Sequence, residues 1–347
     1  MTDQKRNVGK AQRESDRVFG EPECERLQLN FQRSRRLKFS LVLATVGRVA
    51  ELSGFLRSLA AQPYPDYELI VVDQNTDDRL VPVLRGYQSQ IQLKHIRSAP
   101  GLSRARNVGL KFADGDIVAF PDDDCWYPAH LLGRVARFFE DHPECDGLTG
   151  RPALPTGEPF PGWDGEPSLV TKSNVWQRAM SLAIFLRRRA IVTIGNFDET
   201  LGIGSGTPWG SGEETDYLLS MFEKDFGILY EPSIVVFHPP LSGCYDRAAR
   251  RKAYVYGQGM GRVLRKHDYS QFQAWKYFLL PLRSAIYSFL TGRPRRALLG
   301  WAMFQGRLAG YAGEFRDERR SGIDSGGSSP APSRRSREPC MRSRTPF

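Results

Sequence analysis

Three consecutive carboxylates, Asp122, Asp123 and Asp124, directly follow a short apolar run. Three negative charges at the end of a buried strand repel one another and are costly to desolvate unless a cation compensates them. Hard divalent cations such as Mg²⁺ and Mn²⁺ choose oxygen ligands of this kind. The segment is therefore either a divalent-cation site or a solvated acidic turn that caps a helix opened by Pro128.

Polar residues mark two further segments. Asp73 and Asn75 follow the apolar run YELIVVD, where they form either a polar turn or a contact to a nucleotide base or ribose. Arg104 and Asn107 lie in SRARN, at the predicted start of a helix. Arginines at a helix N-terminus oppose the macrodipole, whereas a bound phosphate would gain from them. The alternative for this second segment is a solvated basic face.

A second acidic cluster follows a glycine-rich loop and begins another predicted helix: Glu213, Glu214 and Asp216. Carboxylates at this position either act as general bases or only stabilise the positive end of the helix dipole. His238 ends the apolar run SIVVF. A single histidine at such a strand end is either structural or a metal ligand.

Short apolar runs alternate with helix-like segments and must position these side chains. The runs FSLVLAT, YELIVVD, IQLKHI and DIVAF occupy 39–45, 67–73, 91–96 and 116–120, and further runs occupy 181–188 and 233–237. Strands separated by helices predict a mainly parallel α/β sheet, covered by helices on both faces. Ligands bind at the carboxyl ends of such strands, where Thr45 to Arg48, Asp73 and Asp122 are expected.

Charge is distributed unevenly along the 347 residues. The net charge is +4 over 1–38, −8 over 39–240 and +14 over 241–347. A basic balance confined to the ends argues against a uniform nucleic-acid binder. Five cysteines without a CxxC pair indicate neither a disulfide scaffold nor a zinc ribbon. With no apolar leader and no predicted spanning segment, we expect a cytoplasmic protein.

Six segments in order resemble the inverting family 2 glycosyltransferases of the GT-A fold: LVLATVGR, IVVDQNTDD, GLSRARNVGL, VAFPDDDCWYP, GSGEETDYLL and FHP. The resemblance covers about 39–240. It implies a Rossmann-like, mainly parallel sheet flanked by helices, with a C-terminal helical extension. It also implies a nucleoside-diphosphate sugar donor, with uridine favoured, and Mg²⁺ or Mn²⁺ on the diphosphate. The acceptor is expected to be a saccharide or lipid-linked, in polysaccharide or glycolipid assembly.

The resemblance also assigns roles to residues. Asp122 and Asp124 are expected to bind the metal, to which His238 contributes. The catalytic base falls on the pair Glu213–Glu214, where the family has Asp at the second position; Glu214 is the first choice, and Asp216 is held in reserve. The residues expected to contact the donor are Ala44, Thr45, Arg48, Asp73, Asn75, Arg104, Asn107 and Asp123.

Three other classes of protein match the sequence less well. A Rossmann dehydrogenase needs G-x-G-x-x-G after the first strand, where LATVGR stands. A sugar nucleotidyltransferase needs a glycine-rich loop with arginine and lysine at that place, which the sequence lacks. A non-catalytic protein acting through its basic ends has no use for the whole carboxylate set.

The domain prediction has four parts. Residues 1–37 and 317–347 are expected to be disordered, and 38–240 to form the catalytic domain, with a nucleotide-binding half (38–125) and an acceptor half (126–240). In the acceptor half, Trp163, Trp176 and Trp209 either stack on sugar rings or pack in the core. The basic helical extension, 241–316, either attaches to an anionic membrane surface or packs on the catalytic domain or a second copy.

Overall fold

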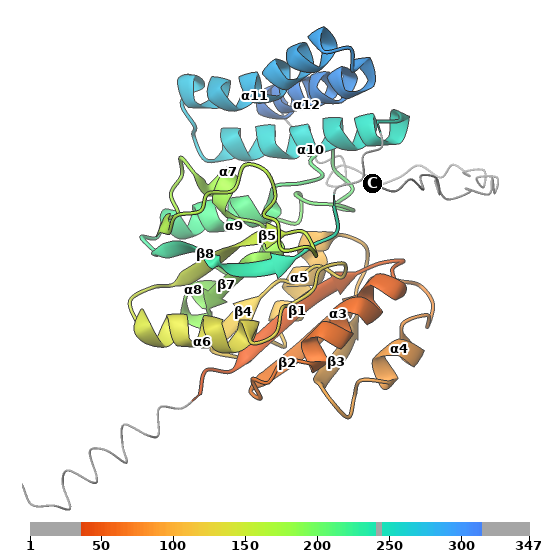
Figure 1. Ribbon diagram of the computed structural model, residues 1–347, viewed down its shortest axis with the longest axis vertical. Helices are drawn as coiled ribbons and strands as arrows, with labels where there is room; N and C mark the ends of the chain where they lie inside the picture. Colours follow the sequence, from red (N-terminus) through yellow and green to blue (C-terminus); the bar gives the residue numbers. More distant parts are fainter. Residues whose placement is uncertain (1–35, 241–244, 314–347) are drawn as a thin grey trace, which may run out of the picture. The chain divides into compact units, whose positions relative to one another are not determined.

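A mixed eight-stranded sheet is the centre of the described structure, a computed structural model covering residues 36–240 and 245–313 (Figure 1). The strands are β1 (Phe39–Thr45), β2 (Tyr67–Asp73), β3 (Gln92–Arg97), β4 (Ile117–Ala119), β5 (Gly147–Ala153), β6 (Ser168–Leu169), β7 (Ile184–Arg187) and β8 (Ile228–Phe237). The helices are α3 (Ala50–Ala60), α4 (Val81–Arg85), α5 (Leu102–Leu110), α6 (Leu131–Asp141), α7 (Val175–Arg178), α8 (Arg188–Ile194), α9 (Glu213–Phe222), α10 (Arg247–Lys266), α11 (Gln271–Leu290) and α12 (Pro294–Ala312).

The strand order is β3-β2-β1-β4-β7-β5-β8-β6. The pairs β1–β2, β2–β3 and β1–β4 are parallel. In contrast, β7 is antiparallel to both β4 and β5. The predicted mainly parallel sheet with C-terminal helices is confirmed. The segment 181–188 differs from the expectation of one strand, because it starts with a 3₁₀ turn (Ser181–Ala183) and only then enters β7.

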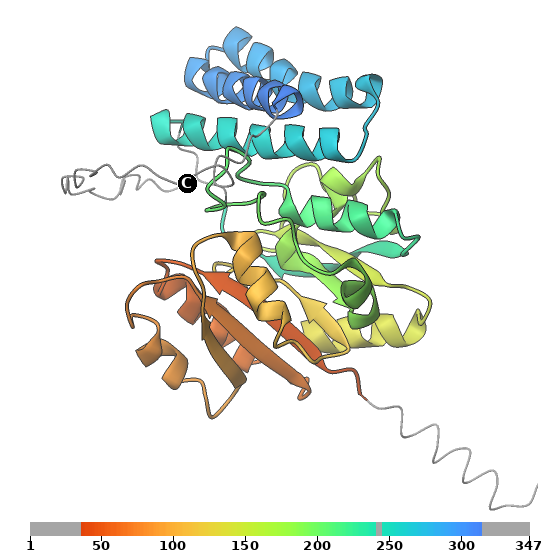
Figure 2. The same cartoon turned by 180° about the vertical axis from the view of Figure 1, so that it is seen from behind.

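The side-chain alternation of β1 divides the core into two layers. Leu41 and Leu43 pack with α3 and α6, whereas Val42 points to the opposite face and packs with α5 and α9. Successive residues of a strand face opposite sides of a sheet, so a continuously apolar strand must be covered on both. Figures 1 and 2 show these two helical layers from opposite sides.

The C-terminal helices join the same core. Met260 and Val263 of α10 pack with the layer that contains α9, and Tyr277 and Phe278 of α11 are also buried there. None of the helices in the described part of the chain has the length and hydropathy needed to cross a bilayer. The predicted disordered ends lie outside the described residues, apart from positions 36 and 37, and the domain division stays a prediction.

Helices α10 and α12 approach each other through glycines. A Cβ built at Gly310 would lie 2.0 Å from the carbonyl oxygen of Gln258, and one at Gly306 would lie 2.1 Å from that of Tyr254. On the other side of the contact, a Cβ at Gly261 would lie 2.1 Å from the carbonyl oxygen of Arg307. Backbones this close leave no space for any larger residue.

We therefore expect Gly310→Ala to lower the free energy of unfolding by about 1 to 3 kcal/mol, because the added methyl group forces the two helices apart. Alanine is otherwise the better helix former by about 1 kcal/mol. Gly133→Ala in α6 is the matched control, since its Cβ would lie 3.8 Å from its nearest neighbour, Cδ2 of Tyr64. Urea unfolding compares the two variants, and equal stability would contradict the glycine contact.

Candidate active site

The acidic turn after β4 lies beside the end of β1. Asp123 is buried and accepts hydrogen bonds from Thr45 Oγ1 at 2.6 Å and from the Arg48 guanidinium at 2.8 Å. Arg48 also forms an ion pair with Asp124. These contacts exist because β1 and β4 are adjacent parallel strands, whose carboxyl ends meet at one edge. Thr45, Arg48 and Asp123 therefore form one cluster, as expected for neighbours in a single site.

His238 directly follows β8 and contacts the acidic turn, although the two segments are distant in sequence. Trp126 and Phe237 exchange backbone hydrogen bonds of 2.8 and 3.0 Å, which hold the end of β8 against the segment after the turn. His238 Nε2 consequently lies 3.5 Å from Asp124 Oδ1. One ligand atom from each of Asp122, Asp124 and His238 lies within 4.8 Å of the others. Two carboxylates and an imidazole form a donor set that fits a divalent cation such as Mn²⁺.

The electrostatics of the turn favour a bound cation. Burial raises the pKa of Asp122 to about 6, the charge of Arg106 opposes this, and the charges of Asp124 and Asp123 add to it. Burial also acts on Asp124, but the hydrogen bond to His238 and the charge of Arg48 outweigh it and lower its pKa. A cation would relieve the repulsion among these carboxylates.

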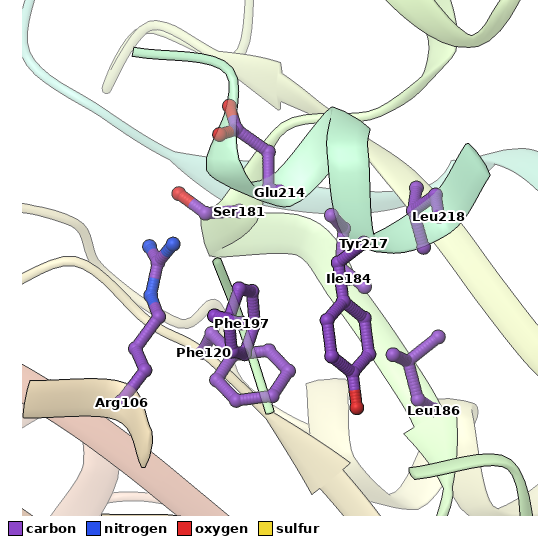
Figure 3. Close-up of a pocket in the computed structure, with 9 residues that line it drawn as sticks. All are labelled: Arg106, Phe120, Ser181, Ile184, Leu186, Phe197, Glu214, Tyr217 and Leu218. Atoms are coloured by element: carbon purple, nitrogen blue, oxygen red, sulfur yellow. The ribbon is translucent and has the colours of Figure 1, made fainter. Parts of the chain in front are cut away.

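Glu214 stands at the start of α9, at the rim of a pocket with mainly apolar walls (Figure 3). The walls are formed by Phe120, Ile184, Leu186, Phe197, Tyr217 and Leu218, with Arg106 and Ser181 as the other polar residues. Burial and the nearby charge of Glu213 raise the pKa of Glu214 well above the usual carboxyl range. A carboxylate with a raised pKa is a suitable general base near neutral pH.

Glu213 makes a different contact from its neighbour. Its Oε1 accepts from the buried Arg106 guanidinium at 3.0 Å, and the same guanidinium lies 3.9 Å from Asp122. Ser181 donates to Asp122 at 3.2 Å and also lines the pocket of Glu214. Arg106 and Ser181 therefore connect the acidic turn with the start of α9.

The reserve base, Asp216, is engaged on the other side of α9. It is buried and lies 2.9 Å from Lys266 Nζ and 2.8 Å from His267 Nε2, both at the end of α10. Burial would lower the pKa of His267, but hydrogen bonds to Asp216 and Glu223 raise it. The structure therefore brings Asp216 into an ion-pair network that holds α10 on α9, away from the contacts of the acidic turn.

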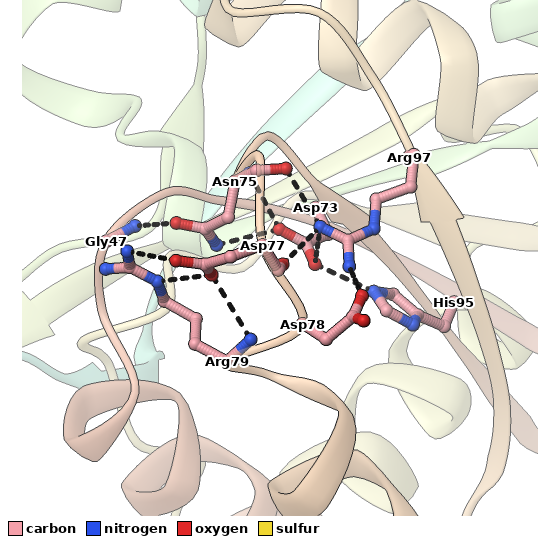
Figure 4. Close-up of polar contacts among 8 residues, drawn as sticks. All are labelled: Gly47, Asp73, Asn75, Asp77, Asp78, Arg79, His95 and Arg97. Atoms are coloured by element: carbon pink, nitrogen blue, oxygen red, sulfur yellow. Dashed lines mark hydrogen bonds and ion pairs between the residues drawn. The ribbon is translucent and has the colours of Figure 1, made fainter.

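Asp73 ends β2 with its carboxylate fully buried (Figure 4). One oxygen accepts from the backbone N–H and side-chain amide of Asn75, at 2.8 and 2.7 Å. The other accepts from His95 at 2.9 Å and lies 3.1 Å from Arg97. Asn75 in turn accepts from the Gly47 N–H at 2.7 Å, which ties this turn to the loop after β1.

Three further residues were predicted to contact the donor, and two of them lie away from the acidic turn. Ala44 is partly buried in β1, next to Thr45. Arg104 pairs with Glu199 at 3.0 Å. The side chain of Asn107 is buried, where its amide donates to the Phe197 carbonyl and accepts from the Phe197 N–H. The structure does not bring Arg104 and Asn107 to the acidic turn, because the loop after α8 occupies their polar groups.

Several site neighbours were missing from the sequence-based list. Arg106, Ser181, His95 and Arg97 all contact predicted site carboxylates. The alternation of β3 is a signal for the last two, since His95 and Arg97 stand two positions apart and pair in register with β2. Nothing in the sequence singles out Ser181, because it contacts Asp122 only through the fold.

The structure decides between packing and sugar stacking for one of the three tryptophans. Trp209 is only 5% exposed and lies under the Arg262 guanidinium, so its ring is a packing residue. Trp163 and Trp176 are partly buried against the same core. Their stacking on sugar rings stays a prediction.

Residues 40–188 match the family model described as Glycosyl transferase family 2. Over these residues the chain is similar to this family of glycosyltransferases. Poly(ribitol-phosphate) beta-N-acetylglucosaminyltransferase TarS of Staphylococcus aureus is 31% identical over 111 residues, which are 30% of this chain and 19% of TarS. A PGL/p-HBAD biosynthesis glycosyltransferase of Mycobacterium tuberculosis is 29% identical over 165 residues, 46% of this chain and 63% of that protein. The chain thus spans less than two thirds of either curated relative.

Solved structures of glycosyltransferases have the same GT-A fold. TarS residues 1–349 in complex with UDP-GlcNAc gives a TM-score of 0.51 at 18% identity, covering 79% of this chain and 91% of that one. The mannosyltransferase PcManGT from Pyrobaculum calidifontis, in complex with GDP-Man and Mn²⁺, gives 0.56 at 14% identity, covering 80% and 88%. At this identity the likeness concerns the fold alone.

Proposed function

We propose that this chain, like the family 2 proteins that it resembles, is an inverting glycosyltransferase, which moves a sugar from a nucleoside-diphosphate sugar to an acceptor hydroxyl. The observation that carries the proposal is the donor set of Asp122, Asp124 and His238, connected through Arg106 and Ser181 to the helix start of Glu214. A cation site and a carboxylate with raised pKa are the two groups that a single-displacement transfer requires.

The carboxyl edge of the sheet supports a nucleotide donor. Asp73 would accept a hydrogen bond from the base, with Asn75 and the loop after β1 beside it. Thr45 and Arg48 hold the carboxylate of Asp123, which would face the donor sugar and ribose. We propose uridine as the base, since the TarS structure of the same fold holds UDP-GlcNAc.

Glu214 would take the proton of the acceptor hydroxyl as that oxygen bonds to the anomeric carbon. The bond from this carbon to the diphosphate oxygen breaks in the same step on the opposite face, so the configuration inverts without a covalent enzyme intermediate. A divalent cation bound by Asp122, Asp124 and His238 would supply charge neutralisation for the leaving diphosphate.

The acceptor in this proposal is a saccharide or a lipid-linked molecule. TarS and the mycobacterial relative are named for poly(ribitol-phosphate) and for PGL/p-HBAD biosynthesis, which supports a role in cell-surface polysaccharide or glycolipid assembly. We propose that the chain acts from the cytoplasmic side, peripherally on the membrane.

A screen of nucleotide sugars with and without Mn²⁺ tests the function. A donor present at about 100 times its Kd stabilises a protein by about 2.7 kcal/mol, and for a chain of this size such a change raises Tm by about 4 to 5 °C. We expect this increase for a UDP-sugar only when Mn²⁺ is present, followed by UDP release upon addition of acceptor. Pyrophosphate release would indicate a nucleotidyltransferase instead. No metal-dependent stabilisation by any donor would favour the non-catalytic alternative.

A further inference from the structure

The outermost C-terminal helices expose an unusual amount of apolar surface. Of the sixteen large hydrophobic side chains that are exposed in the described residues, ten belong to α11 and α12. These ten residues, here called the α11 face, are Phe272, Trp275, Leu279, Leu280, Ile286, Tyr287, Phe289, Leu290, Leu298 and Trp301. Exposed apolar side chains concentrated on two neighbouring helices indicate an interaction site rather than ordinary surface.

The periodicity of α11 places most of this surface on one side of the helix. Phe272, Leu279, Ile286 and Leu290 are spaced by seven, seven and four residues, which is the repeat of one helix face. The residues on the opposite side are buried: Ala274, Tyr277, Phe278, Pro281, Ala285 and Ser288. Both views show α10 between the sheet and the α11–α12 pair (Figures 1 and 2). The inner side of α11 is thus already covered, and its outer side has no covering element among the described residues.

The charge on these helices has one sign. Residues 271–312 contain six lysines and arginines and no aspartate or glutamate. Lys276 and Arg283 lie within the exposed stripe, and Arg293, Arg295 and Arg296 are exposed at the turn between the helices. The sixth, Arg307, is turned inward and donates to the Tyr277 carbonyl. The α11 face is therefore apolar, aromatic and positive.

We propose that the α11 face docks on an anionic membrane surface. Large apolar side chains would enter the acyl boundary, Trp275, Tyr287 and Trp301 would lie at the headgroups, and the arginines would meet lipid phosphates. A second copy docking through the same face would place its own positive charges opposite those of the first copy. Charge complementarity therefore favours an anionic lipid surface over a second copy.

This inference narrows the predicted basic attachment, 241–316. Tyr277 and Phe278 are buried, and Lys266 is engaged with Asp198 and Asp216, so these three residues pack the helices onto the domain. The inference rests on the proposed peripheral location and not on the proposed catalysis. Its test is therefore independent of donor binding.

Co-sedimentation of the full chain with phosphatidylcholine vesicles, with and without phosphatidylserine, tests the inference. We expect binding only to the anionic vesicles, weakened by salt. Replacing three arginines, Arg293→Gln with Arg295→Gln and Arg296→Gln, should weaken it about 100-fold, since each basic residue near anionic lipid contributes about a factor of five. Arg57→Gln with Arg85→Gln, on exposed positions of α3 and α4, is the charge control and should bind like the wild type.

The apolar side is tested by Phe272→Ser with Leu290→Ser, whose side chains are 86% and 77% exposed and can change without disturbing the fold. This variant should lose vesicle binding and keep metal-dependent donor binding. Val192→Ser with Leu169→Ser, exposed elsewhere, is its control. Absence of anionic vesicle binding, or binding that both the triple arginine variant and the Phe272→Ser with Leu290→Ser variant retain, would overturn the proposal. A dimer in ultracentrifugation that Phe272→Ser with Leu290→Ser dissolves would also overturn it and assign the face to a second copy.

Discussion

Glu214→Gln is expected to retain donor binding and to lose sugar transfer by about 10² to 10⁴-fold, the usual contribution of a positioned general base. Glutamine matches the shape of glutamate but cannot accept a proton. Burial and the charge of Glu213 already disfavour the ionised form of Glu214, so removing its charge should leave the fold intact. Single-turnover transfer and donor binding, measured on the same preparation, separate the two effects.

The pH profile provides an independent measurement of the same base. Only the deprotonated carboxylate can take the proton, and the pKa of Glu214 is raised, so kcat/KM should increase with pH through a limb above the usual carboxyl range. Asp216→Asn is the comparison, because it disturbs the network with Lys266 and His267 and should reduce stability first. If Asp216→Asn loses transfer at unchanged stability while Glu214→Gln remains active, the base is Asp216.

Asp124→Ala, or Asp122→Ala, is expected to abolish metal-dependent donor binding while the protein stays folded. Outer-shell partners of metal sites are typically worth 10- to 100-fold in affinity, and a direct ligand should cost more. The fold should survive because burial and the neighbouring carboxylates already disfavour the charged form of Asp122, and because Asp124 is partly exposed. Titration of UDP in the presence of Mn²⁺ measures the loss.

Asp141→Ala is the matched control for these variants, since Asp141 is exposed at the end of α6. Its affinity for UDP with Mn²⁺ should equal that of the wild type. Unchanged affinity in Asp122→Ala and Asp124→Ala would remove the metal assignment while leaving the similarity to the family untouched.

The positions of Asp73 and Asp122 at one edge of the sheet were predictable from local pattern. Continuous apolar runs define strands, and helices between them impose parallel crossovers, so residues directly after β1, β2 and β4 must converge. The order of the motifs in the sequence likewise indicates the family. The convergence of these residues and the order of the motifs depend only on patterns that are local in sequence and on the right-handed crossover between parallel strands.

Long-range contacts determine the positions of the remaining site residues. The type of a residue does not reveal which distant residue forms its hydrogen bond or ion pair. His238 joins the acidic turn only through the pairing of Trp126 with Phe237. The two carboxylates on α9 separate because Asp216 meets Lys266 and His267, whereas Glu214 meets a mainly apolar pocket. The aromatic residues of 271–312 divide into core and surface only when α12 and Trp176 of α7 cover one side of α11. Burial and charge pairing are properties of the packed chain. The sequence alone therefore identifies these side chains as candidates, and only the tertiary structure determines which of them lie in the site, in the core or at the surface.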